Sequence, residues 1–247
     1  MIRFIGIDLA WGERNLSGLA VLEWDAIERG LRLTKSDLLH SDEDIRSAIT
    51  CISGKDSCLL AIDAPIIAPN KSGTARTCDR EVSRDFRRYH AGAYPANREK
   101  CARPIRLRKL LEKEGYNPDP VLSSQSPCRH QLEIFPHPAQ VVLFKRERII
   151  KYKKGSVADK RSGLAELVEN IQRYLCRGDP LLIDTPVLRT LLDTNVGSLS
   201  GRAMKGFEDC VDALLCAYMA AFYWQWGDTR CRIYGDLKTG YIICPRI

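Results

Sequence analysis

The chain has 247 residues, a net charge of +7 and 45% hydrophobic residues. This length suits one domain, or one domain with a large insertion, and the composition excludes a disordered, collagen-like or low-complexity chain. The longest apolar run, residues 213–224, is too short to span a bilayer, and the N-terminus carries no signal peptide. We therefore expect a cytoplasmic protein without membrane contact, whose ten cysteines stay reduced.

The positive charge is concentrated in two segments. Residues 70–113 hold 13 Lys and Arg against 5 Asp and Glu, and residues 145–161 hold 8 against 2. Local basic patches favour a polyanionic partner, which we expect to be nucleic acid, either DNA or RNA. The alternative interpretation is a solvated basic surface without a specific partner.

The first quarter of the chain predicts an α/β fold with a mixed sheet. Three strands precede one helix, which begins after Ser41 as N-cap, and a fourth strand follows. If the first and fourth strands are parallel neighbours, Asp8 and Asp63 at their carboxyl ends lie together, where open α/β sheets hold ligands. The predicted elements are strands at 1–7, 16–24, 31–36 and 59–63, a turn at 11–15 and a helix at 41–54.

The segment 66–130 interrupts this pattern after the fourth strand. It is basic and rich in Pro, Gly and Asn, and its clearest helix covers 105–114. Long irregular connections are usually functional, so we expect a basic insertion or lid within a single domain that covers 1–247. After it, the pattern predicts a strand at 131–135, helices at 136–144, 162–176, 185–193 and 201–225, and a hairpin that pairs 230–234 with 241–244.

Two further aspartates stand on the last predicted helix. Asp209 and Asp212 are three residues apart and share one helix face, at the head of an apolar stretch. The small residues Ala213, Cys216 and Ala220 continue that face, which would let the helix lie close to the sheet. Carboxylates at a helix N-terminus also interact with the dipole, but charged groups among apolar neighbours usually need a partner or a metal. Together with the two strand ends, four carboxylates indicate a divalent cation site.

These features resemble the ribonuclease H-like superfamily, in which the first strand ends in an aspartate and a late helix supplies further acids. The run Asp209–Leu214 resembles the Asp-x-x-Asp-Ala-Leu motif of RuvC-type Holliday-junction resolvases. The chain is most similar to the domain of unknown function 429 family of predicted nucleases. Its marks recur as Gly6–Trp11, Ala61–Pro65, Arg76–Glu81, Leu132–Pro138, Tyr152–Gly155 and Gly235–Pro245.

The resemblance implies a ribonuclease H-like mixed sheet flanked by helices and a nuclease activity on phosphodiester bonds. In a two-metal-ion mechanism, Asp8 would bridge two Mg²⁺ or Mn²⁺ ions, and Asp63, Asp209 and Asp212 would complete the ligand set. Glu133 is a fifth candidate acid, as a ligand or as a residue behind the ligands. Which of Asp209, Asp212 and Glu133 bind metal directly is left open.

Basic side chains near these acids are candidates for nucleic-acid contacts. Three arginines repeat every four residues and would line one helix face, with tyrosines nearby for base stacking, although a salt-bridged surface helix would show the same pattern. Two adjacent lysines are candidates for orienting the scissile phosphate. The predicted contacts are Arg76, Arg80, Arg84, Arg87, Arg88, Lys153 and Lys154 for phosphates, and Tyr89, Tyr94 and Tyr116 for bases.

Two other functions remain as alternatives. One is a non-catalytic nucleic-acid-binding protein, which would not need four aspartates at element ends. The other is an actin-like ATPase or kinase, but no second Gly-Ile-Asp strand follows residue 63 and the chain is short for two lobes. The sequence does not decide whether the substrate is DNA, RNA or a small phosphodiester, or whether cleavage is internal or terminal. It also leaves open whether the protein forms a homodimer.

Overall fold

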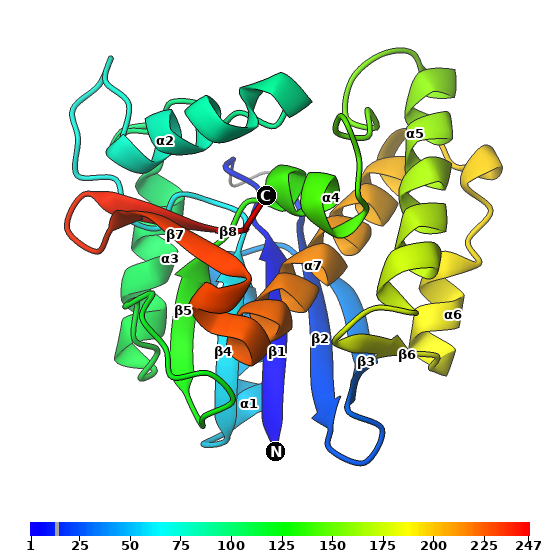
Figure 1. Ribbon diagram of the computed structural model, residues 1–247, viewed down its shortest axis with the longest axis horizontal. Helices are drawn as coiled ribbons and strands as arrows, with labels where there is room; N and C mark the ends of the chain where they lie inside the picture. The colour runs from blue at the N-terminus through cyan, green and yellow to red at the C-terminus, as the bar shows by residue number, and fades with distance from the viewer. Residues whose placement is uncertain (13–14) are drawn as a thin grey trace.

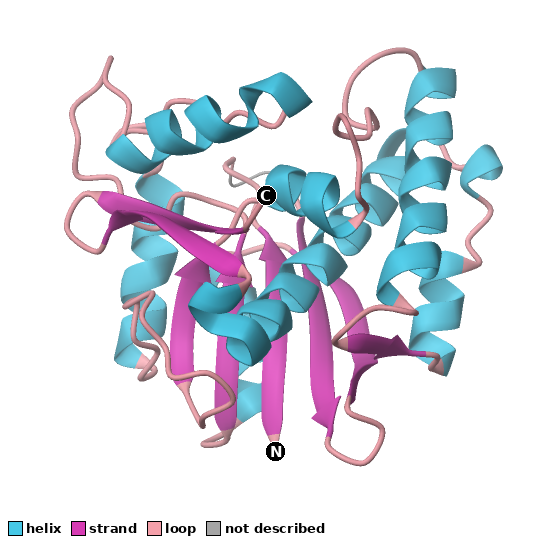
Figure 2. Ribbon diagram, viewed as in Figure 1, coloured by secondary structure: helices cyan, strands magenta, loops and turns pink. Residues whose placement is uncertain are grey.

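The computed structural model describes residues 1–12 and 15–247. The predicted turn at 11–15 includes residues 13 and 14, which lie outside the described residues. A six-stranded mixed sheet, ordered β5-β4-β1-β2-β3-β6, has helices on both faces, which confirms the predicted α/β architecture (Figures 1 and 2). The strands of this sheet are β1 (Ile2–Asp8), β2 (Ser17–Asp25), β3 (Gly30–Leu39), β4 (Ser57–Ile62), β5 (Arg129–Glu133) and β6 (Leu181–Ile183).

The first and fourth strands are parallel neighbours, which is the condition under which the sequence places Asp8 and Asp63 together. Strand β1 pairs antiparallel with β2, which pairs antiparallel with β3, whereas β4 runs parallel to β1 and β5 parallel to β4. In this register Ile7 lies opposite Ile62, so the next residues, Asp8 and Asp63, emerge at the same edge of the sheet. The Asp63 backbone N–H donates a 2.9 Å hydrogen bond to the Ile7 carbonyl and extends the ladder to that edge.

Helix α7 (Gly201–Trp226) crosses one face of the sheet, and α1 (Asp42–Ser53) lies behind the other (Figure 1). Ser41 caps α1 through a reciprocal hydrogen-bond pair with Asp44, as its sequence predicted. Helix α3 (Ala102–Lys113) packs beside α1. The other helices are α2 (Thr77–Phe86), α4 (Pro136–Leu143), α5 (Val157–Asn170) and α6 (Pro186–Leu192).

Two glycines allow α7 to lie almost directly on the sheet. A Cβ on Gly6 of β1 would stand 2.0 Å from the Ala213 carbonyl oxygen, and a Cβ on Gly18 of β2 would stand 2.0 Å from the Asp209 carbonyl oxygen. Both distances are far shorter than van der Waals contact, so only glycine fits at either position. The predicted close approach of the small-residue helix face is thereby confirmed. It also places the Asp209 backbone against β2, the strand next to β1, which ends in Asp8.

The segment between β4 and β5 contributes to both major apolar clusters. Leu107 and Leu111 of α3 belong to the main core. Helix α2 packs through Val82 and Phe86 against the hairpin of β7 (Cys231–Asp236) and β8 (Gly240–Pro245), and it lies above that hairpin in Figure 1. The segment predicted as an insertion or lid is therefore built into the body of the molecule.

Several elements differ from the sequence prediction: β3 continues to Leu39 instead of ending at 36, and β5 covers Arg129–Glu133 instead of 131–135. Strand β6 has three residues, too few to show a strand period, and it was missed. Helix α5 begins at Val157 instead of 162, because Ser156 and Asp159 form a reciprocal N-terminal cap. Within the described part of the chain, no helix is long and apolar enough to cross a membrane.

Candidate active site

Three of the four aspartates line one cleft at the carboxyl edge of the sheet. Asp8 ends β1, Asp63 follows β4 directly, and Asp209 reaches the same cleft from α7. The cleft has a volume of about 300 Å³, and two lysines, Lys153 and Lys205, also line it. The parallel register of β1 and β4 and the close packing of α7 therefore bring together residues from three distant parts of the chain.

The fourth aspartate, Asp212, is fully buried beside this cleft. The Tyr152 hydroxyl donates a 2.7 Å hydrogen bond to Asp212 Oδ1 and itself accepts one of 2.9 Å from Gln140 Nε2. Lys153 Nζ lies 2.8 Å from Asp212 Oδ2, yet this oxygen accepts no hydrogen bond of good geometry. One carboxylate oxygen is thus fixed by a tyrosine, and the other is balanced by charge alone.

Asp209 is paired with a lysine that sequence reasoning missed. Lys205 Nζ lies 2.5 Å from Asp209 Oδ1 and 2.8 Å from Glu208 Oε1. The spacing of three and four residues on one helix was the available signal, because side chains so placed are neighbours on a helix surface. The structure therefore places two ammonium groups among the four aspartates.

The carboxylates of Asp8 and Asp63 have fewer stabilising contacts than those of Asp209 and Asp212. Within residues 1–12 and 15–247, no group donates a hydrogen bond to either carboxylate. Burial raises the pKa of Asp8 well above its ordinary value and the pKa of Asp63 to about 6. The Lys153 ammonium opposes both shifts, whereas the negative charge of Asp212 adds to them. The cluster is therefore short of positive charge near its two strand-end carboxylates.

Burial and the neighbouring negative charges act on the pKa of Lys153 in opposite directions. Burial alone would lower the pKa of its ammonium, but the attraction of Asp212, and then of Asp8 and Asp63, raises that pKa above its ordinary value. Lys153 therefore remains charged at neutral pH and acts as the principal counterion of the aspartates.

Glu133 lies outside this cluster. At the end of β5, its Oε1 and Oε2 accept hydrogen bonds of 2.6 and 2.8 Å from Arg76, and the Ile66 N–H donates a third of 3.1 Å. Burial raises the pKa of Glu133 to about 7, although the Arg76 charge opposes the shift. The Glu133 oxygens are committed to Arg76, and a role for Glu133 as a ligand or behind the ligands stays a prediction.

The same contacts correct the prediction for Arg76. Its side chain is only 1% exposed and bonds to Asp79, Glu133 and the Ile67 carbonyl. A phosphate therefore has no access to this guanidinium. The i, i+4 arginine pattern suggested a surface position, but Arg76 is the N-cap of α2 and its side chain points into the protein.

The other predicted basic residues remain on the surface. Arg80, Arg84 and Arg87 line a groove of about 510 Å³ along α2, although Arg84 also pairs with Asp85. Lys154 Nζ lies 3.2 Å from the hydroxyl of the exposed Tyr94. The guanidinium of Arg88, which is also exposed, lies 4.6 Å from the ring centre of its neighbour Tyr89.

The rings of Tyr116 and His137 pack inside the protein. Tyr116, a predicted stacking residue, is buried, and its hydroxyl donates a 2.7 Å hydrogen bond to Ser53 Oγ, so it has no access to a base. The His137 ring centre lies 5.1 Å from that of Phe135, and burial lowers the pKa of His137 to about 4. His137 is therefore neutral at physiological pH.

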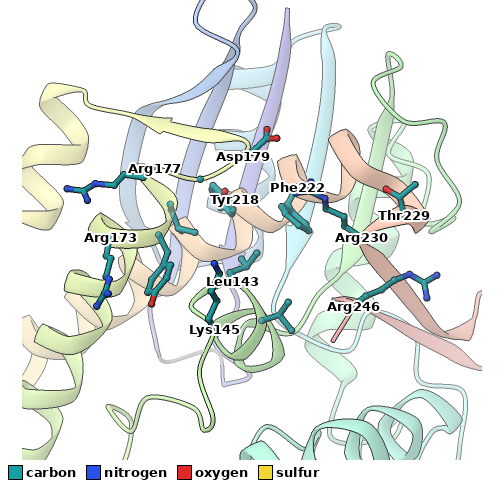
Figure 3. Close-up of a pocket in the computed structure, with 14 residues that line it drawn as sticks. Leu143, Lys145, Arg173, Arg177, Asp179, Tyr218, Phe222, Thr229, Arg230 and Arg246 are labelled. Atoms are coloured by element: carbon teal, nitrogen blue, oxygen red, sulfur yellow. The ribbon is translucent and has the colours of Figure 1, made fainter.

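A second basic cavity, also of about 510 Å³, lies on the outer side of α7 (Figure 3). Tyr218 and Phe222 of α7 form part of its wall, and it shares no lining residue with the aspartate cleft. Along the helix, Phe222 is about 15 Å beyond Asp212, at 1.5 Å per residue. Its charged lining consists of Lys145, Arg173, Arg177, Arg230, Arg246 and one acid, Asp179.

Comparison with known proteins identifies a family. The family model described as "Protein of unknown function (DUF429)" matches residues 6–239, which confirms the family that the sequence motifs suggested. The crystal structure of the yeast mitochondrial Holliday junction resolvase is similar, with 11% sequence identity and a TM-score of 0.40, over 91% of this chain and 78% of the resolvase chain. No curated protein matches this chain.

Proposed function

This chain belongs to the DUF429 family, and we propose from its site that the protein is a metal-dependent nuclease that hydrolyses phosphodiester bonds of nucleic acid. One observation carries the proposal. Four aspartates from β1, β4 and α7 gather at the carboxyl edge of the sheet, and two of them, Asp8 and Asp63, have no hydrogen-bond donor among the described residues. Such a cluster is costly for folding alone, so its presence supports a role in binding a cation.

The donor set fits Mg²⁺ or Mn²⁺ in its chemistry, because hard divalent cations prefer carboxylate oxygens and water. The buried Asp212 Oδ2, which accepts no hydrogen bond, is an oxygen ready for a cation. Among the described residues, however, no three Asp, Glu, His or Cys side chains stand close enough together to hold an ion as they are placed. Lys153 Nζ lies 2.8 Å from Asp212 Oδ2 and Lys205 Nζ lies 2.5 Å from Asp209 Oδ1, so a cation that binds these oxygens must displace the ammonium groups.

In this proposal Asp8, Asp63, Asp209 and Asp212 would hold the metal, with Asp8 between the β4 and α7 carboxylates. A bound divalent pair would activate water and stabilise the leaving oxygen. Tyr152 keeps Asp212 in one orientation through its 2.7 Å hydrogen bond. Lys153, once released from Asp212, would contact a non-bridging oxygen of the scissile phosphate.

The surface around the cleft supports an anionic polymer as substrate. Lys154 lies beside the cleft lysine Lys153 in sequence, and the groove along α2 presents Arg80, Arg84 and Arg87. Cationic side chains along a groove contribute affinity through release of counterions from phosphates. The acids would therefore serve the cleavage chemistry of a nuclease, and the cationic side chains would bind the phosphate backbone of its substrate.

The test is cleavage of a labelled panel of single-stranded, duplex and four-way-junction DNA and of RNA, each with Mg²⁺, Mn²⁺ or EDTA. The variants are Asp8→Asn and Asp63→Asn. Asp184→Asn is the matched control, because Asp184 is exposed and pairs only with Arg189 on the described surface. We expect cleavage in Mg²⁺ or Mn²⁺ that EDTA and both site variants abolish and that the control retains.

Two results would contradict the proposal. Cleavage that survives in Asp8→Asn and Asp63→Asn would place the chemistry elsewhere. Salt-sensitive binding of the panel without cleavage in either metal would favour a nucleic-acid-binding protein that uses the same surface.

A further inference from the structure

Several residues of the family motifs do not belong to the aspartate cluster. They line another cleft, next to the aspartate cleft. The motif after β1 supplies Trp11, and the motif after β4 supplies Ala64 and Pro65. Segments from β5 and from the β7–β8 hairpin complete the cleft, although they are far apart in sequence. Its other lining residues include Arg76, Asp79, Ala93, Tyr94, Glu133, Ile134, Phe135 and Ile242.

The open surface of this cleft is largely aromatic and apolar. Trp11 is 45% exposed and Tyr94 is 71% exposed, and Phe135 and Ile134 lie deeper. Exposed apolar surface that is contiguous and bordered by polar groups is typical of binding sites. The cleft has a volume of about 80 Å³ and is open on one side, which suits the edge of one planar ring.

The charged groups on its floor are already committed to one another. Every guanidinium nitrogen of Arg76 donates to Asp79, Glu133 or the Ile67 carbonyl. Asp79 additionally accepts hydrogen bonds from the backbone N–H groups of Arg76 and Ala96. This buried network fixes the floor, and it leaves the rings above it as the groups that meet a ligand.

The cleft joins the two surfaces already described. Trp11 and Asp63 line both this cleft and the aspartate cleft, whereas Asp79 and Ala93 line both this cleft and the arginine groove of α2. The protein therefore presents, in order, the three carboxylates that line the aspartate cleft, the exposed rings and a row of arginines. This order matches a phosphodiester to be cut, the adjoining base and the next phosphates of one strand.

We propose that the cleft of Trp11 and Tyr94 takes the unstacked base of the nucleotide next to the scissile phosphate, so the substrate is single-stranded or locally unpaired nucleic acid. This inference rests on the proposed nuclease function. A base inside a continuous duplex has both faces stacked and cannot enter a side cleft without leaving its pair. Stacking on rings does not depend on base identity, so little sequence preference is expected.

Lys154 supports this placement. Its ammonium lies 3.2 Å from the Tyr94 hydroxyl, and its neighbour Lys153 faces the aspartates. One cation thus stands beside the proposed base site and the next stands at the proposed scissile phosphate. Adjacent positions along the chain match adjacent groups of one nucleotide.

The experiment measures binding in EDTA, where no metal-dependent cleavage takes place. Fluorescence anisotropy compares a labelled single strand, the same strand with one abasic position, and its duplex. The variants are Trp11→Ala and Tyr94→Ala, and the matched controls are Trp11→Phe and Tyr94→Phe, which keep a ring. A strand that carries 2-aminopurine reports stacking directly, because its fluorescence falls when the base stacks.

We expect the intact single strand to bind about tenfold more tightly than the duplex or the abasic strand, the size of one stacked base. The alanine variants should lose that preference and the 2-aminopurine quenching, and the phenylalanine variants should keep most of both. Equal binding of the three ligands, or unchanged quenching in both alanine variants, would overturn the base site. Because no step requires cleavage, this outcome is distinct from failure of the nuclease proposal.

Discussion

Lys153 Nζ lies 2.8 Å from the Oδ2 oxygen of Asp212, in a position where a carboxylate-bound cation would compete with it. Asp212 is fully buried, so it needs a positive neighbour at all times. The ammonium therefore stabilises the aspartate cluster without metal, and a divalent ion is expected to replace it. In the proposed function, the lysine and the metal would thus be alternative counterions of one site.

The first prediction follows from this exchange. Lys153→Met removes the counterion of a buried carboxylate, which should lower the free energy of unfolding in EDTA by about 1–3 kcal/mol, less than for a fully buried pair because Lys153 is 34% exposed. Mg²⁺ should restore most of the loss and should bind more tightly than to the unmodified protein. Thermal unfolding and calorimetric titration measure both effects. An equal loss with and without Mg²⁺ would show that metal and lysine do not share the site.

The second prediction concerns pH. The pKa of Asp63 is raised from 3.8 to about 6, so in the folded, metal-free protein this carboxyl is largely protonated below about pH 6. A metal must displace that proton, so metal affinity should fall about tenfold for each pH unit below 6. Titration with Mn²⁺ across this range measures the slope. Asp63→Asn should bind metal weakly and with a shallower pH dependence.

The free energy of unfolding of the metal-free protein should fall as pH rises, whereas metal affinity should rise. Because the folded-state pKa of Asp63 exceeds its unfolded value, the folded protein holds a proton that the unfolded chain releases between about pH 4 and 6. In EDTA, this group makes the free energy of unfolding fall as pH rises through that window. Saturating metal should remove the effect, and a wild-type stability curve unaffected by Asp63→Asn would contradict the raised pKa.

The third prediction separates Arg76 from the phosphate contacts. Arg76→Met would leave Asp79 and Glu133 buried without their cation, which should cost about 3–5 kcal/mol of stability. Chemical denaturation measures this loss. At temperatures where the variant is folded, the salt dependence of nucleic-acid binding should match that of the unmodified protein. A stable variant with a reduced salt slope would restore Arg76 as a phosphate contact.

The fourth prediction is that the arginines along α2 bind the phosphate backbone of the nucleic acid. Arg84→Gln and Arg87→Gln should each weaken single-strand binding and reduce the slope of log affinity against log salt by about 1. The matched control is Arg177→Gln, which removes the same charge from the separate cavity on the outer side of α7. An equal effect of all three variants would mean that the overall charge of the protein, and not the groove, attracts the strand.

Sequence patterns predicted the aspartate cluster because each signal was local. A strand that ends in Asp8, a strand followed by Asp63 and a helix with Asp209 and Asp212 can each be recognised within a few residues. Parallel pairing of β1 and β4 then fixes the edge at which the carboxylates meet. The fold class and the four aspartates could therefore be recognised from local patterns, whereas their meeting at one edge depended on the assumed parallel pairing of two distant strands.

The partners of these groups could not be predicted in the same way. Arg76 and Glu133 are 57 residues apart, and no local pattern indicates that they pair across the floor of the aromatic cleft. The periodic arginines of α2 suggested that Arg76 belonged with its surface neighbours. Tyr152 and Asp212, which are 60 residues apart, pair through tertiary packing in the same way.

The last prediction links the fold directly to the site. Gly18→Ala would place a Cβ 2.0 Å from the Asp209 carbonyl oxygen, and since both atoms belong to packed backbone segments, α7 must move away from β2. Overpacking of this kind typically costs about 1–3 kcal/mol, and it would also shift Asp209 and Asp212 relative to Asp8. We expect weaker metal binding together with a lower melting temperature. Gly12→Ala is the control, because a Cβ there meets no atom of the described residues closer than 3.8 Å. Full metal affinity in a destabilised Gly18→Ala protein would show that the carboxylates do not depend on the depth at which α7 lies.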